Sequence, residues 1–80
     1  MAHITDLDLP NVEALLANEG SIEIGYKHPI GEIAVATDGH QALAMLRRYR
    51  TESLADTLLR LDDAIKDAVT NGERTDEINR

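Results

Sequence analysis

Histidine and acidic side chains are the residues of this sequence that could carry out chemistry. Asp38 lies two positions before His40, and His3 lies close to Asp6 and Asp8. A general acid–base pair needs its two groups within hydrogen-bond reach. Because residues i and i+2 at the start of a helix point in different directions, we expect that Asp38 and His40 do not meet. Asp38 is better suited to cap the helix that we expect to follow it.

Metal binding and nucleophilic catalysis have equally little support. His3, His28 and His40 lie on three separate segments without the spacing of metal ligands, and the sequence has no cysteine. Ser53 has no evident base beside it. We therefore expect no catalytic residue, no metal site and no cofactor, and we predict that the protein is not an enzyme.

The charge of the chain limits its partners. The segment Arg47–Arg50, with the sequence RRYR, combines cations with an aromatic ring and could contact nucleic acid. However, the net charge of −7 repels nucleic acid and anionic membranes, so we expect neither as a direct partner. The start, MAHITDLDLP, lacks the basic and apolar regions of a secretory signal, and no apolar run approaches the roughly 20 residues of a membrane span. We therefore expect a cytoplasmic protein.

A stripe of carboxylates is the strongest candidate for a binding surface. Placed on a helical wheel, four acids fall within an arc of about 60°. They are Glu52, Asp56, Asp63 and Asp67. Leu59 lies at the border of this stripe, and an apolar side chain rimmed by charges is typical of an interface anchor. These five residues form the predicted partner-binding surface; the alternative is a solvated helix face without a function of its own.

The helix that carries this stripe is predicted between Thr51 and Gly72. Thr51 or Ser53 can cap its start, and Asn71-Gly72 is a stop signal. Its apolar residues fall within an arc of about 100°, which is typical of a helix face packed on a core. They are Leu54, Leu58, Leu61, Ile65, Ala68 and Val69.

The first third of the chain predicts a short helix at Leu9–Asn18, which Asp8 can cap, followed by a hairpin. Apolar and polar residues alternate in 21–27 and again after a four-residue turn at 28–31. Pairing Lys27 with Glu32 brings the large apolar side chains onto one face, with Ile24 opposite Val35.

The other face of this hairpin would carry only small residues. They are Gly25, Ala34 and Ala36. Such residues are too small to fill a core, but they let another backbone approach closely, so they form a candidate dimer face. The core itself is aliphatic, without Phe or Trp. The thin core and the unpaired hairpin edges favour a homodimer, formed either by strand pairing or through this face.

A further helix from about His40 to Tyr49 completes the predicted order α-β-β-α-α. This is an α+β fold in which a short N-terminal helix and two later helices pack on one face of a two-stranded antiparallel hairpin. We expect a single domain over residues 1–80, with a core from about residue 8 to 72 and a polar tail over 73–80.

The succession HPIGEIAVATDGHQALAML, ESLADTLLRLDDAI and TDEIN resembles small uncharacterised proteins of proteobacterial phages and prophages, over most of the chain from Leu7 to Asn79. The resemblance brings no catalytic or binding residues with it. It implies a genomic setting in which short acidic proteins often act by binding and blocking a host protein.

Together these features predict a small acidic, non-enzymatic protein-binding module. In its more specific form it is a phage-type inhibitor whose carboxylates occupy the nucleic-acid groove of a host defence or transcription protein. Carboxylates one helical turn apart lie about 6 Å from each other, close enough to imitate successive phosphates. The alternative is a structural or assembly accessory subunit that is stable only in a complex.

Overall fold

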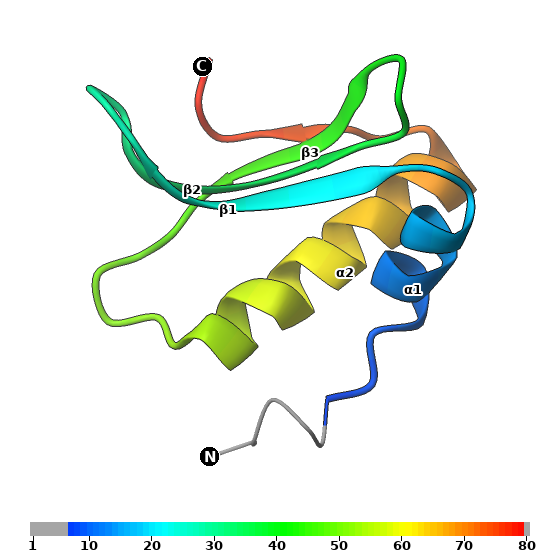
Figure 1. Cartoon of the computed structure of the whole chain (residues 1–80), viewed down its shortest axis with the longest axis horizontal. Helices are drawn as coiled ribbons and strands as arrows, with labels where there is room; N and C mark the ends of the chain where they lie inside the picture. The colour runs from blue at the N-terminus through cyan, green and yellow to red at the C-terminus, as the bar shows by residue number, and fades with distance from the viewer. Residues whose placement is uncertain (1–6, 80) are drawn as a thin grey trace.

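The computed structural model describes residues 7–79 and shows two helices packed on one face of a four-stranded sheet (Figure 1). The strand order is β1-β2-β3-β4; the first three strands are antiparallel, and β4 runs parallel to β3. A parallel pair needs a crossover connection, which α2 provides. The elements are α1 (Pro10–Ala17), β1 (Ser21–Lys27), β2 (Gly31–Thr37), β3 (Ala42–Arg47), α2 (Leu54–Asn71) and β4 (Thr75–Asp76).

The protein is therefore α+β, but the predicted two-stranded hairpin and the order α-β-β-α-α are wrong. β3 stands where the sequence predicted a helix over 40–49. Its residues, ALAMLR, mostly have high helix propensity, but propensity differs by only a few tenths of a kcal/mol per residue. As a strand, the segment pairs with β2 and places Ala44 and Leu46 in the core, at 0% and 2% exposure. Pairing and burial outweigh the local preference.

The hairpin register differs from the predicted one by a single residue. Lys27 pairs with Gly31 across a three-residue loop, and Ile24 pairs with Ala34 instead of Val35. Gly31 has a φ of 108°, which glycine adopts readily, and so it can close this shorter loop. Because successive strand residues point to opposite faces, the shift puts Ile24 and Val35 on opposite faces. The prediction assumed one apolar face, whereas the sheet carries large apolar residues on both.

The predicted dimer face is not a surface. Ala34 and Ala36 are 0% exposed and lie in the core, while Gly25 lies on the opposite face of the sheet, paired with Ile33. The prediction that these three residues form one exposed face is therefore wrong. The physical reason is the register shift, which turns the two alanines of β2 toward the helices.

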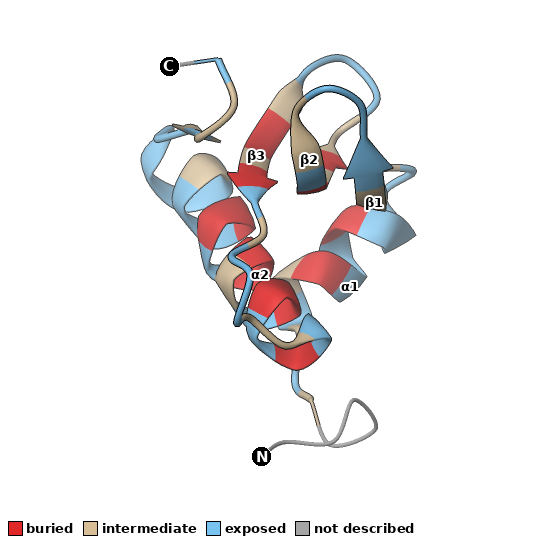
Figure 2. Cartoon of the chain, turned by 90° about the vertical axis from the view of Figure 1, so that its left-hand side faces the viewer, coloured by how far each residue is buried: buried red, intermediate tan, exposed pale blue. Residues whose placement is uncertain are grey.

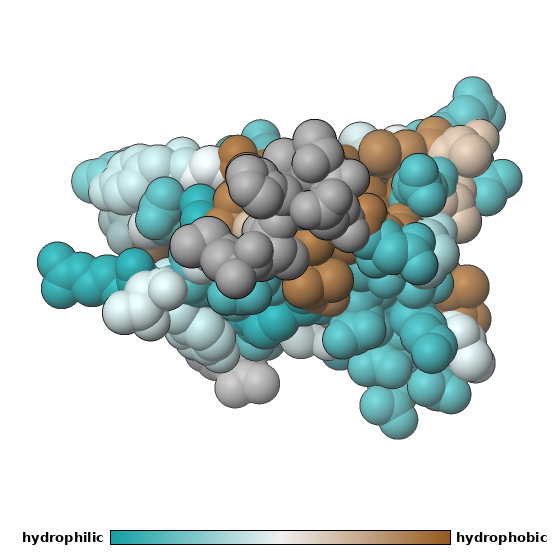
Figure 3. Space-filling model, turned by 90° about the horizontal axis from the view of Figure 1, so that it is seen from below, coloured by the Kyte–Doolittle hydropathy of each residue, from teal (hydrophilic) through white to brown (hydrophobic). Residues whose placement is uncertain are grey.

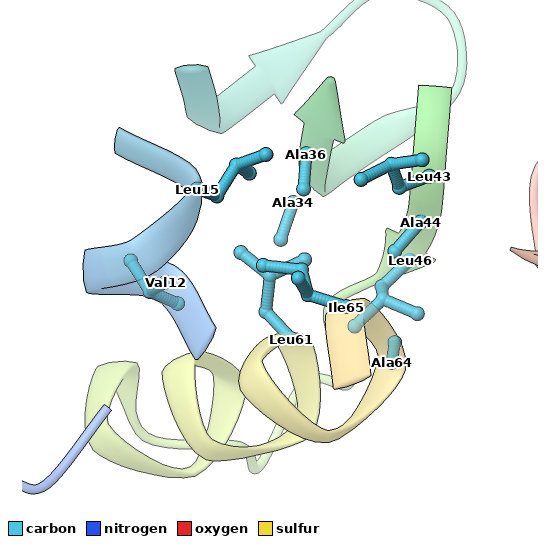
Figure 4. Packing of buried hydrophobic residues seen from close by; sticks show 10 residues of the cluster. All are labelled: Val12, Leu15, Ala34, Ala36, Leu43, Ala44, Leu46, Leu61, Ala64 and Ile65. Atoms are coloured by element: carbon cyan, nitrogen blue, oxygen red, sulfur yellow. The ribbon is translucent and has the colours of Figure 1, made fainter. Parts of the chain in front are cut away.

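The core lies between the inner face of the sheet and the two helices (Figure 2). Alanines of β2 and β3 face larger aliphatic side chains of α2, so the helix can lie close to the sheet (Figure 4). The buried cluster consists of Val12, Leu15, Ala34, Ala36, Leu43, Ala44, Leu46, Leu61, Ala64 and Ile65.

The long helix is confirmed. Ser53 is its N-cap, and its hydroxyl accepts a hydrogen bond from the Asp56 N–H; Gly72 ends the helix with a φ of 69°. Of the predicted apolar arc, Leu58, Leu61 and Ile65 are buried, and Ala68 packs partly buried against the core. The other two residues of the arc, Leu54 and Val69, lie near the two ends of the helix and are 43% and 71% exposed.

The polar tail predicted from residue 73 onward takes part in the fold. Thr75–Asp76 pair with β3 at Ala44 and Met45 and form β4. The Glu77 N–H then donates to the Met45 oxygen at 2.8 Å. The reason is that β3 is a strand with a free edge, which the predicted helix would not have offered.

Candidate protein-binding face of helix α2

Glu52 does not belong to the exposed carboxylate stripe. Its side chain is only 7% exposed and pairs with Arg60, with 2.6 Å between Glu52 Oε2 and Arg60 Nε. Thr57 also donates to it, at 3.0 Å. These hydrogen bonds, above all that from Arg60, hold the pKa of Glu52 below its ordinary value. The helical wheel misplaced this residue because Glu52 precedes the N-cap and does not follow the helical rotation.

Arg60 joins three parts of the chain. Besides Glu52, it binds Glu77 beyond β4 at 3.2 Å and donates to the Arg47 oxygen at the end of β3 at 2.7 Å. Its guanidinium also lies over the Tyr49 ring, 4.5 Å from the centroid. The surrounding carboxylates, with Glu52 first, raise the pKa of Arg60 above its ordinary value. Since its donors are used inside the molecule, we assign this cluster to stability and not to chemistry.

Asp62 is a buried acid for which the sequence predicted no role. It is 6% exposed, and its carboxylate accepts hydrogen bonds from the Asn11 and Val12 N–H groups at 2.9 and 2.8 Å. The Asn11 side-chain amide donates a third, at 2.8 Å. Asp62 of α2 therefore caps α1, whose own N-cap residue, Leu9, makes no side-chain cap; the predicted capping role of Asp8 is wrong. An acid beside the apolar arc of α2 was the signal that could have revealed it.

The remaining acids of the stripe are free of such roles. Asp56, Asp63 and Asp67 are exposed, and within residues 7–79 their side chains take part in no ion pair or hydrogen bond. Leu59 is 39% exposed. It lies one turn from Asp56 and one turn from Asp63, so carboxylates flank it on both sides. On the helical side of the molecule, hydrophobic residues form separate patches among hydrophilic ones (Figure 3).

The other candidates for chemistry fall into structural positions. Asp38 caps the β2–β3 turn, accepting from the His40 and Gln41 N–H groups at 2.8 and 2.9 Å, and not a second helix as predicted. The Gln41 bond, followed by that of His40, lowers the pKa of Asp38. His3 and Asp6 lie outside the described residues. In the described part of the chain, no three His, Cys, Asp or Glu side chains are grouped so that they could hold a metal ion.

The basic segment is also used within the fold. Arg48 donates to the Thr57 hydroxyl at 3.0 Å and lies 3.6 Å from Glu32, while Tyr49 covers Arg60. Neither helix, over the residues that the structure describes, has the length and apolar character to cross a membrane.

No family model, no curated protein and no solved structure matches this chain.

Proposed function

We propose that this protein is a small, non-enzymatic protein-binding module of the cytoplasm that contacts its partner through the outer face of α2. The observation that carries the proposal is that the acids near this helix fall into two groups, one bound inside the molecule and one exposed without a bound partner in the described chain. Glu52, Asp62 and Glu77 are bound inside the molecule. Asp56 and Asp63, on either side of the exposed Leu59, have no such role.

Folding alone does not require this arrangement. A polar residue at position 59 would suit an isolated, solvated helix face better than leucine, although a single exposed leucine is common. An apolar anchor surrounded by polar groups that exclude water is, in contrast, the usual anatomy of a binding hot spot. The proposal therefore assigns Leu59 the role of the anchor and the three free aspartates, Asp56, Asp63 and Asp67, that of the polar rim.

In its more specific form, the proposal is that the protein is a phage-type inhibitor that occupies the basic nucleic-acid groove of a host protein. The resemblance to phage proteins and the net charge of −7 support this version. Asp63 and Asp67 lie one helical turn apart, and Asp56 lies two turns before Asp63. Because Glu52 is bound to Arg60 inside the molecule, only three carboxylates of the stripe remain to imitate phosphates. Binding by charge predicts an affinity that falls steeply with salt.

The experiment is capture of proteins from a bacterial lysate on the immobilised chain, compared with two variants. Leu59→Asp introduces a charge into the proposed anchor. Val69→Asp is the matched control, because Val69 is an exposed aliphatic residue of the same helix, away from the stripe. We expect the wild type and Val69→Asp to retain the same protein, and Leu59→Asp to lose it while keeping its far-UV circular dichroism.

Two results would contradict the proposal. Equal capture by all three chains would remove Leu59 from the interface, and unfolding of Leu59→Asp would show that its contact is internal. The triple variant Asp56→Asn, Asp63→Asn, Asp67→Asn tests the charge component separately. If it binds as strongly as the wild type, and if added salt has no effect, phosphate mimicry is excluded and the apolar anchor alone remains.

A further inference from the structure

The sheet has an open edge at β1. Among residues 7–79, β2 is the only strand that pairs with β1, so the other side of β1 is unpaired (Figure 2). All seven residues of β1, Ser21–Lys27, pair with β2 without a bulge, and none of them is proline. Bulges and prolines are common means by which proteins protect an edge strand. The free N–H and C=O groups of β1 can therefore accept another strand.

The side chains of β1 are complementary to those of a second β1. In a two-fold symmetric antiparallel pair, residues at equal distances from the axis face each other. With the axis at Gly25, Glu23 faces Lys27 of the partner subunit, and Ile24 faces Tyr26 of the partner subunit. Because of the two-fold symmetry, each of these contacts occurs twice in the dimer. An axis at Ile24 instead sets Glu23 against a glycine and Lys27 against a serine, so the axis at Gly25 is the one that joins opposite charges.

The charged residues are free to make this contact. Glu23 and Lys27 are exposed, and neither forms an ion pair within the described chain. Both point to the sheet face that the helices leave open, because Ile24 between them packs toward the core. Directly opposed residues of antiparallel strands have Cβ atoms about 4.5–5.5 Å apart, within reach of an ion pair between these long side chains.

The apolar residues of β1 support the same register. Tyr26 points to the same face as Ile24, because the two are two positions apart in β1, and it is 70% exposed there. Across the axis its ring would lie on the half-buried Ile24 of the other copy. A Cβ placed on Gly25 finds no atom within 4 Å, so no side chain of the described chain packs on the outer face of the sheet at the axis.

We propose that two copies of this chain associate by antiparallel pairing of their β1 strands, in the register centred on Gly25, so that the two four-stranded sheets become one. The helices of both copies then lie on the same side. Such a short interface is smaller than that of a stable dimer, so the association is in the micromolar range. It uses a surface different from the outer face of α2 and does not depend on the proposed function.

The experiment is sedimentation velocity over a series of concentrations on four chains: wild type, Glu23→Lys, Lys27→Glu and the double charge swap. Each single variant places like charges opposite each other twice, and we expect each dissociation constant to rise about tenfold. The double swap restores both ion pairs and the wild-type constant. A mixture of the two single variants also forms complementary pairs, and we expect it to dimerise although neither variant does so well alone.

Net charge serves as an internal control. Lys27→Glu makes the charge of −7 two units more negative, and Glu23→Lys makes it two units less negative. A general effect of charge would move the two dissociation constants in opposite directions, whereas the proposal weakens both. Glu73→Lys, at an exposed position after α2, has the same charge change as Glu23→Lys and should leave the constant unchanged.

A wild-type chain that remains monomeric at the highest concentration overturns the proposal. So does a dimer that the single variants do not weaken, or a mixture that does not associate. Amide hydrogen exchange gives a second measurement on the wild type alone. Protection of 21–27 should increase with protein concentration, and protection that is independent of concentration contradicts pairing at this edge.

Discussion

Replacing Asp62 tests whether the buried acid of α2 holds the first helix in place. The Asp62 carboxylate accepts three hydrogen bonds from the start of α1, two of them from the Asn11 and Val12 N–H groups at 2.9 and 2.8 Å. No side chain at the N-cap of α1 can replace it. In Asp62→Ala both N–H groups lose their partner next to the core, and the contact between α1 and α2 loses its polar part.

The size of the effect follows from these contacts. Loss of an N-cap costs about 0.5–2 kcal/mol, and a hydrogen bond to a charged group contributes about 1.5–3 kcal/mol, values that overlap and do not add. We take about 3 kcal/mol for the loss and subtract roughly 0.6 kcal/mol because alanine is the better helix former. The free energy of unfolding should thus fall by about 2.4 kcal/mol, which corresponds to a decrease in Tm of about 10–20 °C for a domain of this size.

Urea unfolding followed by far-UV circular dichroism measures this change. Asp63→Ala is the matched control, because the substitution is chemically the same on the same helix but removes an exposed carboxylate; its free energy of unfolding should not fall and should rise by roughly 0.6 kcal/mol, the same propensity gain. Asp62→Asn keeps one acceptor oxygen and should lie between the two. If Asp62→Ala and Asp63→Ala have equal free energies of unfolding, the capping role of Asp62 is wrong.

Two further predictions concern acid and packing. Arg60 lowers the pKa of Glu52 below its ordinary 4.5, so the ion pair contributes stability that is present above that pH and lost as the pH falls through the lowered pKa. The urea midpoint should therefore fall less steeply with acid in Glu52→Gln, and equal slopes would contradict this. Gly20→Ala places a Cβ 2.5 Å from Leu15 Cδ1 and should lower the free energy of unfolding by about 1–3 kcal/mol. Gly25→Ala, with no atom within 4 Å, should keep the wild-type urea midpoint, and a similar loss in both would refute the packing argument.

Local signals made the long helix predictable. The cap at Ser53, the stop at Gly72 and the spacing of Leu58, Leu61 and Ile65 all act within a few residues of one another. The same spacing correctly placed Asp63 on the exposed side. It failed for Glu52, because a residue before the N-cap takes its position from its ion pair with Arg60 and not from the helical rotation.

Contacts between distant segments decided the rest of the candidate site. The dimer face predicted at Gly25, Ala34 and Ala36 depended on the hairpin register, and a shift of one residue removed it. Asp62 became a capping residue only because α1 lies against α2, fifty positions away in the sequence. Neither the register nor that contact has a signal within the local sequence.

The sequence by itself determined the long amphipathic helix and the strand character of 21–27 and 31–37. Only the tertiary structure decided that ALAMLR is a strand, that the tail supplies β4, and which of the acids near α2 are bound inside the molecule. The physical reason is that a helix is held by bonds between near neighbours, whereas a strand exists only through the segment beside it. The helix propensity of residues 42–47 is a local property and does not depend on the open edge of β2. Pairing with that edge also buries the segment, and the two gains together outweigh the propensity.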